Sequence, residues 1–448
     1  MLITLAAPAF AETWYIENGD ITVKAGETGN DVTQNNVTTK NDTDTIITNQ
    51  KTDTASSNTV TIDAGSDKVE VTLKDVNIDT SSRNKAAVSV TGSGNTTIKL
   101  DGDNHLTGGN GIYSNSIGSL TISGGTVTAT GGGSTGSNGL GGRGIYSNGS
   151  VTISGGTVKA AGGDGSDGGS GISSSSGVTV SDGTVTANGG NSTGSYGSGG
   201  DGIRSGGGVT ISGNTVNAAG GNGGKVGGYG ICSFDRVAIS GGTVEAAGGS
   251  SGSSNGGSGI YSNDIDLSGS LELTAKAGSP NGKALSQKGS ELDLDAIKDK
   301  LGPGAKVTAT DADGKVIDQV PIPRPVEPEK PVIPEESSSS SDGGSAAPSA
   351  PAFSLPGLTV TDKDGQRISY TSTQSGNTLT VCVGRLTASF RISLAALRQL
   401  RAEGIETITF QTILCSTTLS VDELLAMGGE DAEAVLTHRF TDSSLTVG

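Results

Sequence analysis

Gly111-Ile112-Tyr113-Ser114, followed by Leu120-Thr121-Ile122-Ser123-Gly124-Gly125-Thr126-Val127-Thr128-Ala129 and a glycine-rich stretch, is a phrase that recurs six times in a chain of 448 residues. Its Gly-Ile pair begins at intervals of 33, 27, 31, 28 and 29 residues, at Gly111, Gly144, Gly171, Gly202, Gly230 and Gly259. Units of this length bury their apolar faces by stacking on their neighbours. The middle of the chain is therefore predicted to be a solenoid.

Within each repeat apolar and polar residues alternate with a period of two, as in Val151-Thr152-Ile153-Ser154. That period predicts short strands with one buried face, and the repeats lack the leucine framework or long helices of other solenoids. An all-β fold follows, a right-handed parallel β-helix. Stacking predicts columns of buried side chains: Leu120, Val151, Val178, Val209, Val237 and Ile265; Ile122, Ile153, Val180, Ile211, Ile239 and Leu267; Val127, Val158, Val185, Val216 and Val244; Ala129, Ala160, Ala187, Ala218 and Ala246.

The β-helix with its two caps is expected to span residues 12–320, with repeats over about 59–277. Residues 14–63 carry less glycine and are expected to cover the first coil, and Leu292–Leu301 to cover the last. Eight or nine coils are predicted, which gives a rod of roughly 40 Å at the usual strand spacing.

A second region begins where the composition changes near Pro321. Residues 321–353 form a Pro/Ser-rich linker, and residues 354–448 a small α+β domain of unknown function. Its predicted strands are Thr378–Val383 and Thr407–Phe410; its predicted helices are Leu394–Glu403 and Val421–Met427, with Ser393 and Ser420 as N-caps and Gly404 after the first helix. His438 is expected to be solvated. Cys382 and Cys415 lie in this domain, and the sequence leaves open a bridge or two buried thiols.

Residues 1–11 end in Ala9-Phe10-Ala11, which has the form of a signal-peptidase site. We therefore expect a secreted or cell-surface protein, although the missing basic segment leaves a cytoplasmic location open. A formal charge of −17 argues against nucleic acid or anionic lipid as a partner. No membrane insertion is expected. Neutral sugars, cations or protein partners remain.

The position after each Gly-Ile pair is the strongest candidate for a binding surface: Tyr113, Tyr146, Ser173, Arg204, Cys232 and Tyr261. If isoleucine points inward, these side chains point outward in one column. Tyr113, Tyr146, Arg204 and Tyr261 would then offer aromatic faces to sugar rings and donors to hydroxyl or carboxylate groups. The alternative is that these residues only pack under variable glycine-rich loops.

A cation site is a weaker candidate. Asp75, Asp79, Asp101 and Asp103 are close enough in the repeat pattern to place several carboxylates near one end of the β-helix, an arrangement that suits calcium. The alternative is that they are solvated turn carboxylates. The ligands of any metal stay unknown.

The phrase Thr-Ile-Ser-Gly-Gly-Thr-Val and the entry from Asp79 to Gly109 resemble a family of secreted bacterial carbohydrate-binding proteins with a pectate-lyase-like, non-catalytic parallel β-helix. The resemblance covers roughly residues 59–277. It implies binding of polysaccharide without cleavage, with calcium as a candidate cofactor. The linker and the C-terminal domain lie outside it.

Two other functional classes stay open. Because signatures of polygalacturonases and a calcium-holding aspartate cluster beside a catalytic base are missing from the sequence, an enzyme that cleaves polysaccharide is the less favoured one. An adhesin-like or purely structural surface spacer, with the C-terminal domain docking to a protein at the cell surface, is the main alternative.

Overall fold

The computed structural model describes residues 11–136, 139–213 and 215–320, and in the C-terminal part residues 358–361, 367–368, 370–375, 377–383, 388–412, 416–429, 432–438 and 443–447. The chain divides into two compact units, Met1–Glu329 and Lys330–Gly448. The predicted signal peptide (residues 1–10 of it), the predicted linker and Cys415 lie outside the described residues.

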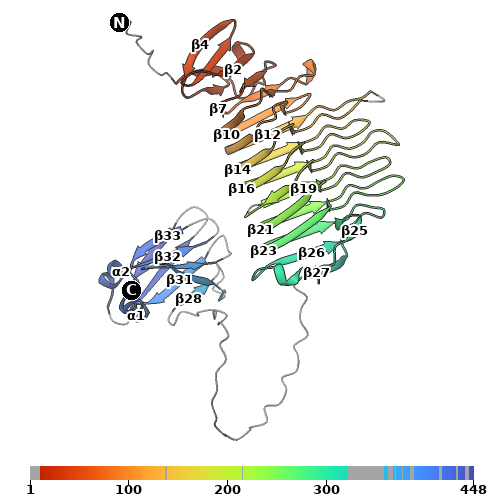
Figure 1. Ribbon diagram of the computed structural model, residues 1–448. Coiled ribbons are helices and arrows are strands. Elements are labelled where there is room, and N and C mark those ends of the chain that lie inside the picture. The colour runs from red at the N-terminus through yellow and green to blue at the C-terminus, as the bar shows by residue number, and fades with distance from the viewer. Residues whose placement is uncertain are drawn as a thin grey trace, which may run out of the picture. The chain divides into compact units, whose positions relative to one another are not determined.

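The first unit is a parallel β-helix of about 11 turns (Figure 1). One of its two sheets, sheet B, contains β1 (Thr13–Tyr15), β5 (Ile46–Thr48), β7 (Lys68–Lys74), β8 (Asn77–Asp79), β10 (Asn95–Gly108), β12 (Leu120–Gly131), β14 (Val151–Ala161), β16 (Val178–Asn188), β18 (Val209–Ile211), β19 (Thr215–Ala219), β21 (Arg236–Ala247), β23 (Asp264–Lys276), β26 (Lys306–Thr310) and β27 (Val316–Val320).

Sheet A is built mostly from shorter strands, and the Gly-Ile phrases begin six of them. It contains β2 (Ile21–Ala25), β3 (Asn30–Gln34), β4 (Val37–Asp42), β6 (Val60–Asp63), β9 (Val88–Thr91), β11 (Ile112–Ser114), β13 (Ile145–Ser147), β15 (Ile172–Ser174), β17 (Ile203–Ser205), β20 (Ile231–Ser233), β22 (Ile260–Ser262), β24 (Leu285–Gln287) and β25 (Ser290–Glu291).

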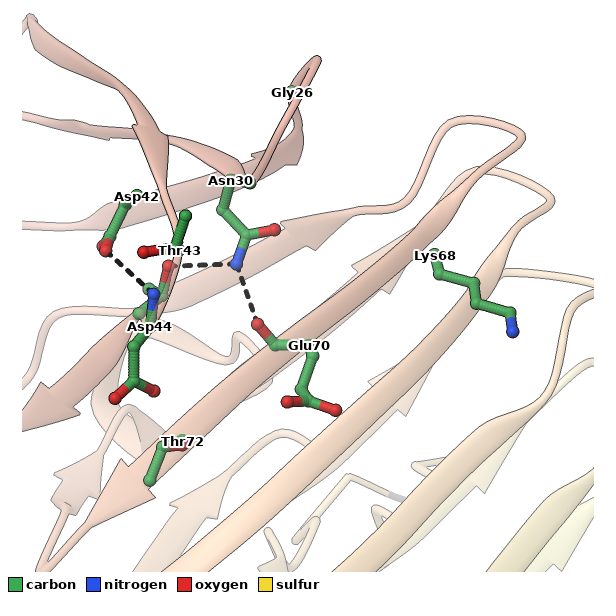
Figure 2. Close-up of a pocket in the computed structure, with 10 residues that line it drawn as sticks. Gly26, Asn30, Asp42, Thr43, Asp44, Lys68, Glu70 and Thr72 are labelled. Atoms are coloured by element: carbon green, nitrogen blue, oxygen red, sulfur yellow. Dashed lines mark hydrogen bonds between the residues drawn. The ribbon is translucent and has the colours of Figure 1, made fainter. Parts of the chain in front are cut away.

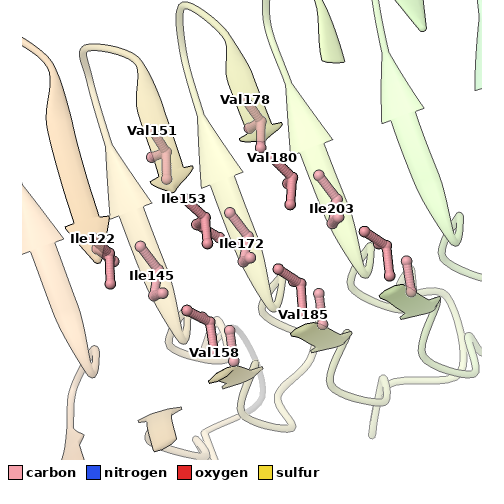
Figure 3. Packing of buried hydrophobic residues seen from close by; sticks show 14 of the residues in the cluster. Ile122, Ile145, Val151, Ile153, Val158, Ile172, Val178, Val180, Val185 and Ile203 are labelled. Atoms are coloured by element: carbon pink, nitrogen blue, oxygen red, sulfur yellow. The ribbon is translucent and has the colours of Figure 1, made fainter. Parts of the chain in front are cut away.

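The register of sheet B confirms the predicted core columns. Leu120 pairs with Val151, and Val151 with Val178, and the same succession holds for the Ile122, Val127 and Ala129 columns. These side chains are almost completely buried and meet the isoleucines of sheet A inside the coil (Figure 3). At one end of the Val127 column stands Asn104, whose buried amide accepts a bond from Val76 N–H and donates to two carbonyls.

The number of coils is larger than the predicted eight or nine. The region expected to be only a cap contributes β1, β2, β5 and β6, which pair in parallel with the coils that follow. Antiparallel strands then cover sheet A at both of its ends and sheet B at its C-terminal end. The β3–β4 hairpin extends sheet A, and β27 ends sheet B, while Leu294 and Ile297 bury themselves at the last coil. At the N-terminal side, by contrast, sheet B ends in β1, which pairs in parallel with β5 and has no second partner strand among the described residues.

The glycine-rich stretches are ordered. Two glycine segments per coil, one leaving sheet B and one returning to sheet A, stack into two layers that we call the glycine wing: residues 131–133, 162–163, 189–190, 220–221 and 248–249 outgoing, and 141–142, 168–169, 199–200, 227–228 and 256–257 returning. In Figure 1 they are the parallel projections of the yellow and green coils.

Backbone hydrogen bonds join the glycine wing within and between its layers. Along the outgoing layer, Gly162 N–H donates to Asn188 O, at the end of β16 in the next coil, at 2.8 Å. Across the layers, Gly163 N–H donates to Gly142 O, Gly190 N–H to Gly169 O, and Gly200 N–H to Gly190 O, each at 2.8 Å. Since extended chains outside sheets ordinarily leave these groups to water, the wing is a second hydrogen-bonded structure beside the β-helix.

The C-terminal unit has two four-stranded sheets and two helices. One sheet contains β28 (Leu358–Thr361), β31 (Ala388–Ser393), β34 (Glu433–His438) and β35 (Ser443–Val447); the other contains β29 (Thr371–Ser375), β30 (Thr378–Cys382), β32 (Thr407–Gln411) and β33 (Ser416–Ser420). The helices are α1 (Leu394–Ala402) and α2 (Val421–Met427).

The structure confirms the predicted helix caps of this unit and contradicts the predicted exposure of His438. Ser393 accepts from Ala396 N–H at 3.2 Å and Ser420 from Glu423 N–H at 3.4 Å, and Gly404 has a φ of +92°, so both N-caps and the helix end are confirmed. The prediction that His438 is solvated is wrong. Its side chain is 0% exposed because it packs edge-on against Phe390, between Thr412 and Thr417.

Candidate functional site

The outer face of sheet A is the candidate functional site. Its register aligns all six residues that follow the Gly-Ile pairs: Tyr113, Tyr146, Ser173, Arg204, Cys232 and Tyr261. The tyrosines and Arg204 are half-buried, but Ser173 is only 5% exposed and Cys232 0%. The predicted continuous column is therefore interrupted, and it divides into two clusters of aromatic and polar side chains.

The first cluster, the Tyr146 cluster, joins Tyr113 and Tyr146 with Arg143, Asn115 and Asn148. The two tyrosine rings stack with centroids 5.3 Å apart and an interplanar angle of 22°, and the Arg143 guanidinium lies 4.8 Å from the Tyr146 centroid. Tyr146 Oη donates to Asn148 Oδ1, and Asn148 Nδ2 donates to Asn115 Oδ1 at 2.6 Å. These two hydrogen bonds hold the side chains of Tyr146, Asn148 and Asn115 in one orientation.

The second cluster, the Tyr261 cluster, joins Tyr229, Tyr261, Arg204, Phe234 and Asp201. Tyr229 stacks on Tyr261 at 4.8 Å, and the Arg204 guanidinium lies 4.9 Å from the Phe234 centroid. Asp201, which is 5% exposed, accepts from Tyr229 N–H at 2.8 Å and from Arg204 at 2.8 Å. Phe234, at 48% exposure, is the open apolar surface of this cluster.

Burial governs the acid–base chemistry of the Tyr261 cluster. It raises the pKa of the Asp201 carboxyl, against the opposing effect of the Tyr229 N–H and of Arg204. It also raises the pKa of Tyr229 and of the Cys232 thiol to about 12 in each case. A thiol with such a pKa is neutral near pH 7 and a poor nucleophile.

Ring orientation differs from the expected flat platform. At centroid separations of 5.3 and 4.8 Å, nearly parallel rings must overlap face to face, because rings side by side in one plane would clash. Each pair therefore covers the inner faces of its rings and presents ring edges and hydroxyl groups instead. The spacing follows from the separation of adjacent strands.

Sequence reasoning missed the residues that support these rings. Arg143, Asp201 and Tyr229 each stand two residues before a strand of sheet A, where the returning segments of the wing end. Arg143 N–H donates to Asn110 Oδ1 and Tyr229 N–H donates to Asp201 Oδ1, both at 2.8 Å. In each case the bond joins residues of two coils that stand two positions before a strand of sheet A. These residues could have been found from the sequence, because each directly precedes the glycine of a Gly-Ile pair.

A cavity of about 270 Å³ in the N-terminal cap is a separate polar feature (Figure 2). Asp42 on its wall is 1% exposed and accepts from Trp14 Nε1 at 3.0 Å and from Glu12 N–H at 3.1 Å. Asn30 donates to Thr45 Oγ1 at 2.9 Å and to Glu70 O at 2.8 Å. These bonds join β3 and β4 to the first coils, so the polar groups there fasten the cap.

Three of the four carboxylates considered for calcium, those of Asp75, Asp79 and Asp101, make local hydrogen bonds or ion pairs. Asp101 pairs with Lys74 at 2.7 Å, Asp75 accepts from Asp103 N–H, and Asp79 accepts from Ser81 N–H. Across the described ranges, no three His, Cys, Asp or Glu side chains are grouped as a metal would require. Nor does any helix in those ranges have the length and apolar character needed to cross a membrane.

Comparisons with protein-family models, with curated proteins and with solved structures find no match.

Proposed function

We propose that this protein is a non-catalytic, secreted or cell-surface protein that binds polysaccharide along the outer face of sheet A. The observation that carries the proposal is the arrangement of the Tyr146 and Tyr261 clusters on one face, in register, over five strand intervals. At the usual strand spacing that distance is about 24 Å. An extended polymer can contact both clusters at once, and two contacts on one chain multiply its affinity.

The chemistry of the clusters suits sugars. Tyr146, Asn148 and Asn115 form a chain of hydrogen-bonding groups that sugar hydroxyls can extend. Phe234 offers an apolar surface to the C–H groups of a sugar ring. Both clusters are held by stacking and by hydrogen bonds to the backbone of neighbouring coils, which lowers the entropic cost of ordering them on binding.

Binding without cleavage is favoured by the state of the reactive groups. In a pectate-lyase-like enzyme Arg204 would be a candidate for the catalytic base, but it forms an ion pair with buried Asp201. Cys232 is buried beneath the outer face and its pKa is raised by that burial. A polysaccharide-cleaving enzyme accordingly has less support than a binding protein.

A structural or adhesin-like spacer is the second candidate. The hydrogen-bonded glycine wing favours it, because two layers of backbone add rigidity to the coils without adding side chains that recognise a ligand. In that case the two clusters serve only to brace the returning segments of the wing.

Electrophoresis of the full chain in native gels that contain soluble polysaccharides separates the two candidates. A binding protein is retarded by at least one polysaccharide of a panel, and repeating the gel with a calcium chelator shows whether calcium supports the binding. Migration unaffected by every polysaccharide would overturn the proposal and leave the spacer.

A further inference from the structure

The two arginines on the outer face of sheet A differ in how their charge is balanced. Arg204 Nη1 lies 2.8 Å from Asp201 Oδ2, a carboxylate that is almost fully buried. Arg143, in the Tyr146 cluster, has no carboxylate within ion-pair distance among the residues that the structure describes. The net charge of −17 disfavours anionic partners over the surface as a whole, but Arg143 is an uncompensated cation at one point of the candidate binding face.

Arg143 is also held in place. Its backbone N–H donates to Asn110 Oδ1 at 2.8 Å, and its guanidinium carbon lies over the Tyr146 ring, 4.8 Å from the centroid. That ring is held by Tyr113 and Asn148. Attraction between the cation and the ring needs no hydrogen bond from the guanidinium, so its planar fork of N–H groups can donate to a ligand. That geometry fits the two oxygens of a carboxylate or sulfate group.

The neighbours of Arg143 on this face are neutral. The next coil contributes Ser170 and Ser173, and the preceding coil contributes Asn110, Tyr113 and Asn115. No acidic side chain of the Tyr146 cluster therefore opposes an anion, in contrast to the Tyr261 cluster, where Asp201 already occupies Arg204. The two clusters consequently differ in the sugars that they can select.

We propose that the Tyr146 cluster selects sugars that carry an anionic group, with Arg143 binding the carboxylate or sulfate and the Tyr146 and Asn148 side chains contacting the adjacent hydroxyls. This inference rests on the proposed polysaccharide binding and adds its specificity. Arg143 acts by charge and by a fixed donor geometry, so lysine at this position is expected to restore only part of its effect.

Three polymers that share one backbone test the inference: dextran, carboxymethyl-dextran and dextran sulfate, each in native gels with the full chain. A panel that also holds polygalacturonate and its methyl ester repeats the comparison on a second backbone. The expected result is stronger retardation by the charged member of a set. Comparing the carboxylated with the sulfated polymer identifies which anion is preferred.

Arg143→Gln is expected to weaken binding of the anionic polymer about tenfold, the loss of one charge-assisted contact, with Arg143→Lys intermediate. Lys159→Gln, which removes an exposed positive charge on sheet B, serves as the charge-matched control and should have little effect. Unchanged far-UV circular dichroism verifies that each variant is folded.

The outcomes separate this inference from the proposed function. Equal retardation by neutral and charged polymers, with Arg143→Gln behaving as wild type, overturns the inference and leaves polysaccharide binding intact. Retardation by none of the polymers overturns both. Equal weakening by Arg143→Gln and Lys159→Gln overturns the role of Arg143, because net charge alone would then explain the selectivity.

Discussion

At the scale of single residues, space rather than backbone angle selects glycine in the wing. Gly200 does not have a positive φ, yet a Cβ there would lie 1.9 Å from Gly169 O of the preceding coil. The same contact recurs where Gly169 approaches Gly142 and where Gly228 approaches Gly200, again at 1.9 Å. Any side chain at these positions must push apart neighbouring coils within the returning layer.

Gly200→Ala is therefore expected to destabilise the β-helix by about 1–3 kcal/mol, the usual cost of an extra methyl group in a close-packed site. Gly208→Ala is the matched control, because its Cβ would lie an ordinary 3.5 Å from Arg236 O and its φ is also not positive. Urea unfolding followed by far-UV circular dichroism measures both. Equal unfolding midpoints would show that the wing is not close-packed.

His438 makes the stability of the C-terminal unit depend on pH. Burial lowers its pKa below the ordinary 6.5, so the folded unit keeps a neutral imidazole where the unfolded chain takes up a proton. Stability is then complete above that ordinary value and falls as the pH drops below it, by at most about 1.4 kcal/mol per pH unit. Protection factors of the described residues between 388 and 438, from amide hydrogen exchange corrected for the intrinsic rate at each pH, should fall from pH 7.5 to pH 5.

His438→Gln should flatten that dependence, whereas His105→Gln, at an exposed position in β10, should leave it unchanged. A flat profile in the wild type would contradict the assignment. The segment around His438 is strand-like, and alternation with period two places His438 on the same face as Ala434 and Leu436, so its burial was predictable. Its partners Phe390 and Thr417 were not, because they lie in other strands.

At the scale of elements, a coil is the unit of the fold. Most of the core was predictable, since alternation with period two fixes which residues point inward and the repeat fixes which of them stack. The first coils were mistaken for a cap because their strands, such as Ile21–Ala25, lack the repeated phrase. The wing was missed because its order depends on hydrogen bonds between coils, which no single repeat reveals.

Deletion of residues 172–202, one interval of 31, should leave the β-helix folded, because it joins Gly171 to Ile203 and places Val209 beside Val151. Deletion of residues 178–192 removes about half a coil and would shift the following columns out of register. We expect a cooperative unfolding transition of reduced stability for the first and loss of native circular dichroism for the second. Trp14, the single tryptophan, reports on the cap in both.

Similar behaviour of the two deletion variants would contradict a register fixed by the repeat. Nearest-neighbour stacking explains why a whole coil can be removed at a limited cost.

At the scale of the whole molecule, the sequence predicted two structured regions and a candidate face, but not the final form of that face. The alignment of Tyr113, Tyr146, Arg204 and Tyr261 followed from the repeat. The division into two clusters did not, because it depends on where Arg143, Asp201 and Tyr229 arrive from the wing. Those side chains convert a row of separate rings into two braced stacks.

The most direct test of the account asks whether this face holds the polysaccharide. The dissociation constant of the full chain for the most strongly retarding polysaccharide is measured for the wild type, Tyr146→Ala, Tyr261→Ala and the control Tyr196→Ala. Tyr196 is 88% exposed and lies in the loop between the outgoing segment 189–190 and the returning segment 199–200, outside the strands of sheet A. We predict that Tyr146→Ala and Tyr261→Ala each weaken binding about tenfold or more, as loss of an aromatic contact does, while Tyr196→Ala has no effect. Binding that is unchanged in the first two variants, or lost in Tyr196→Ala, would contradict the account.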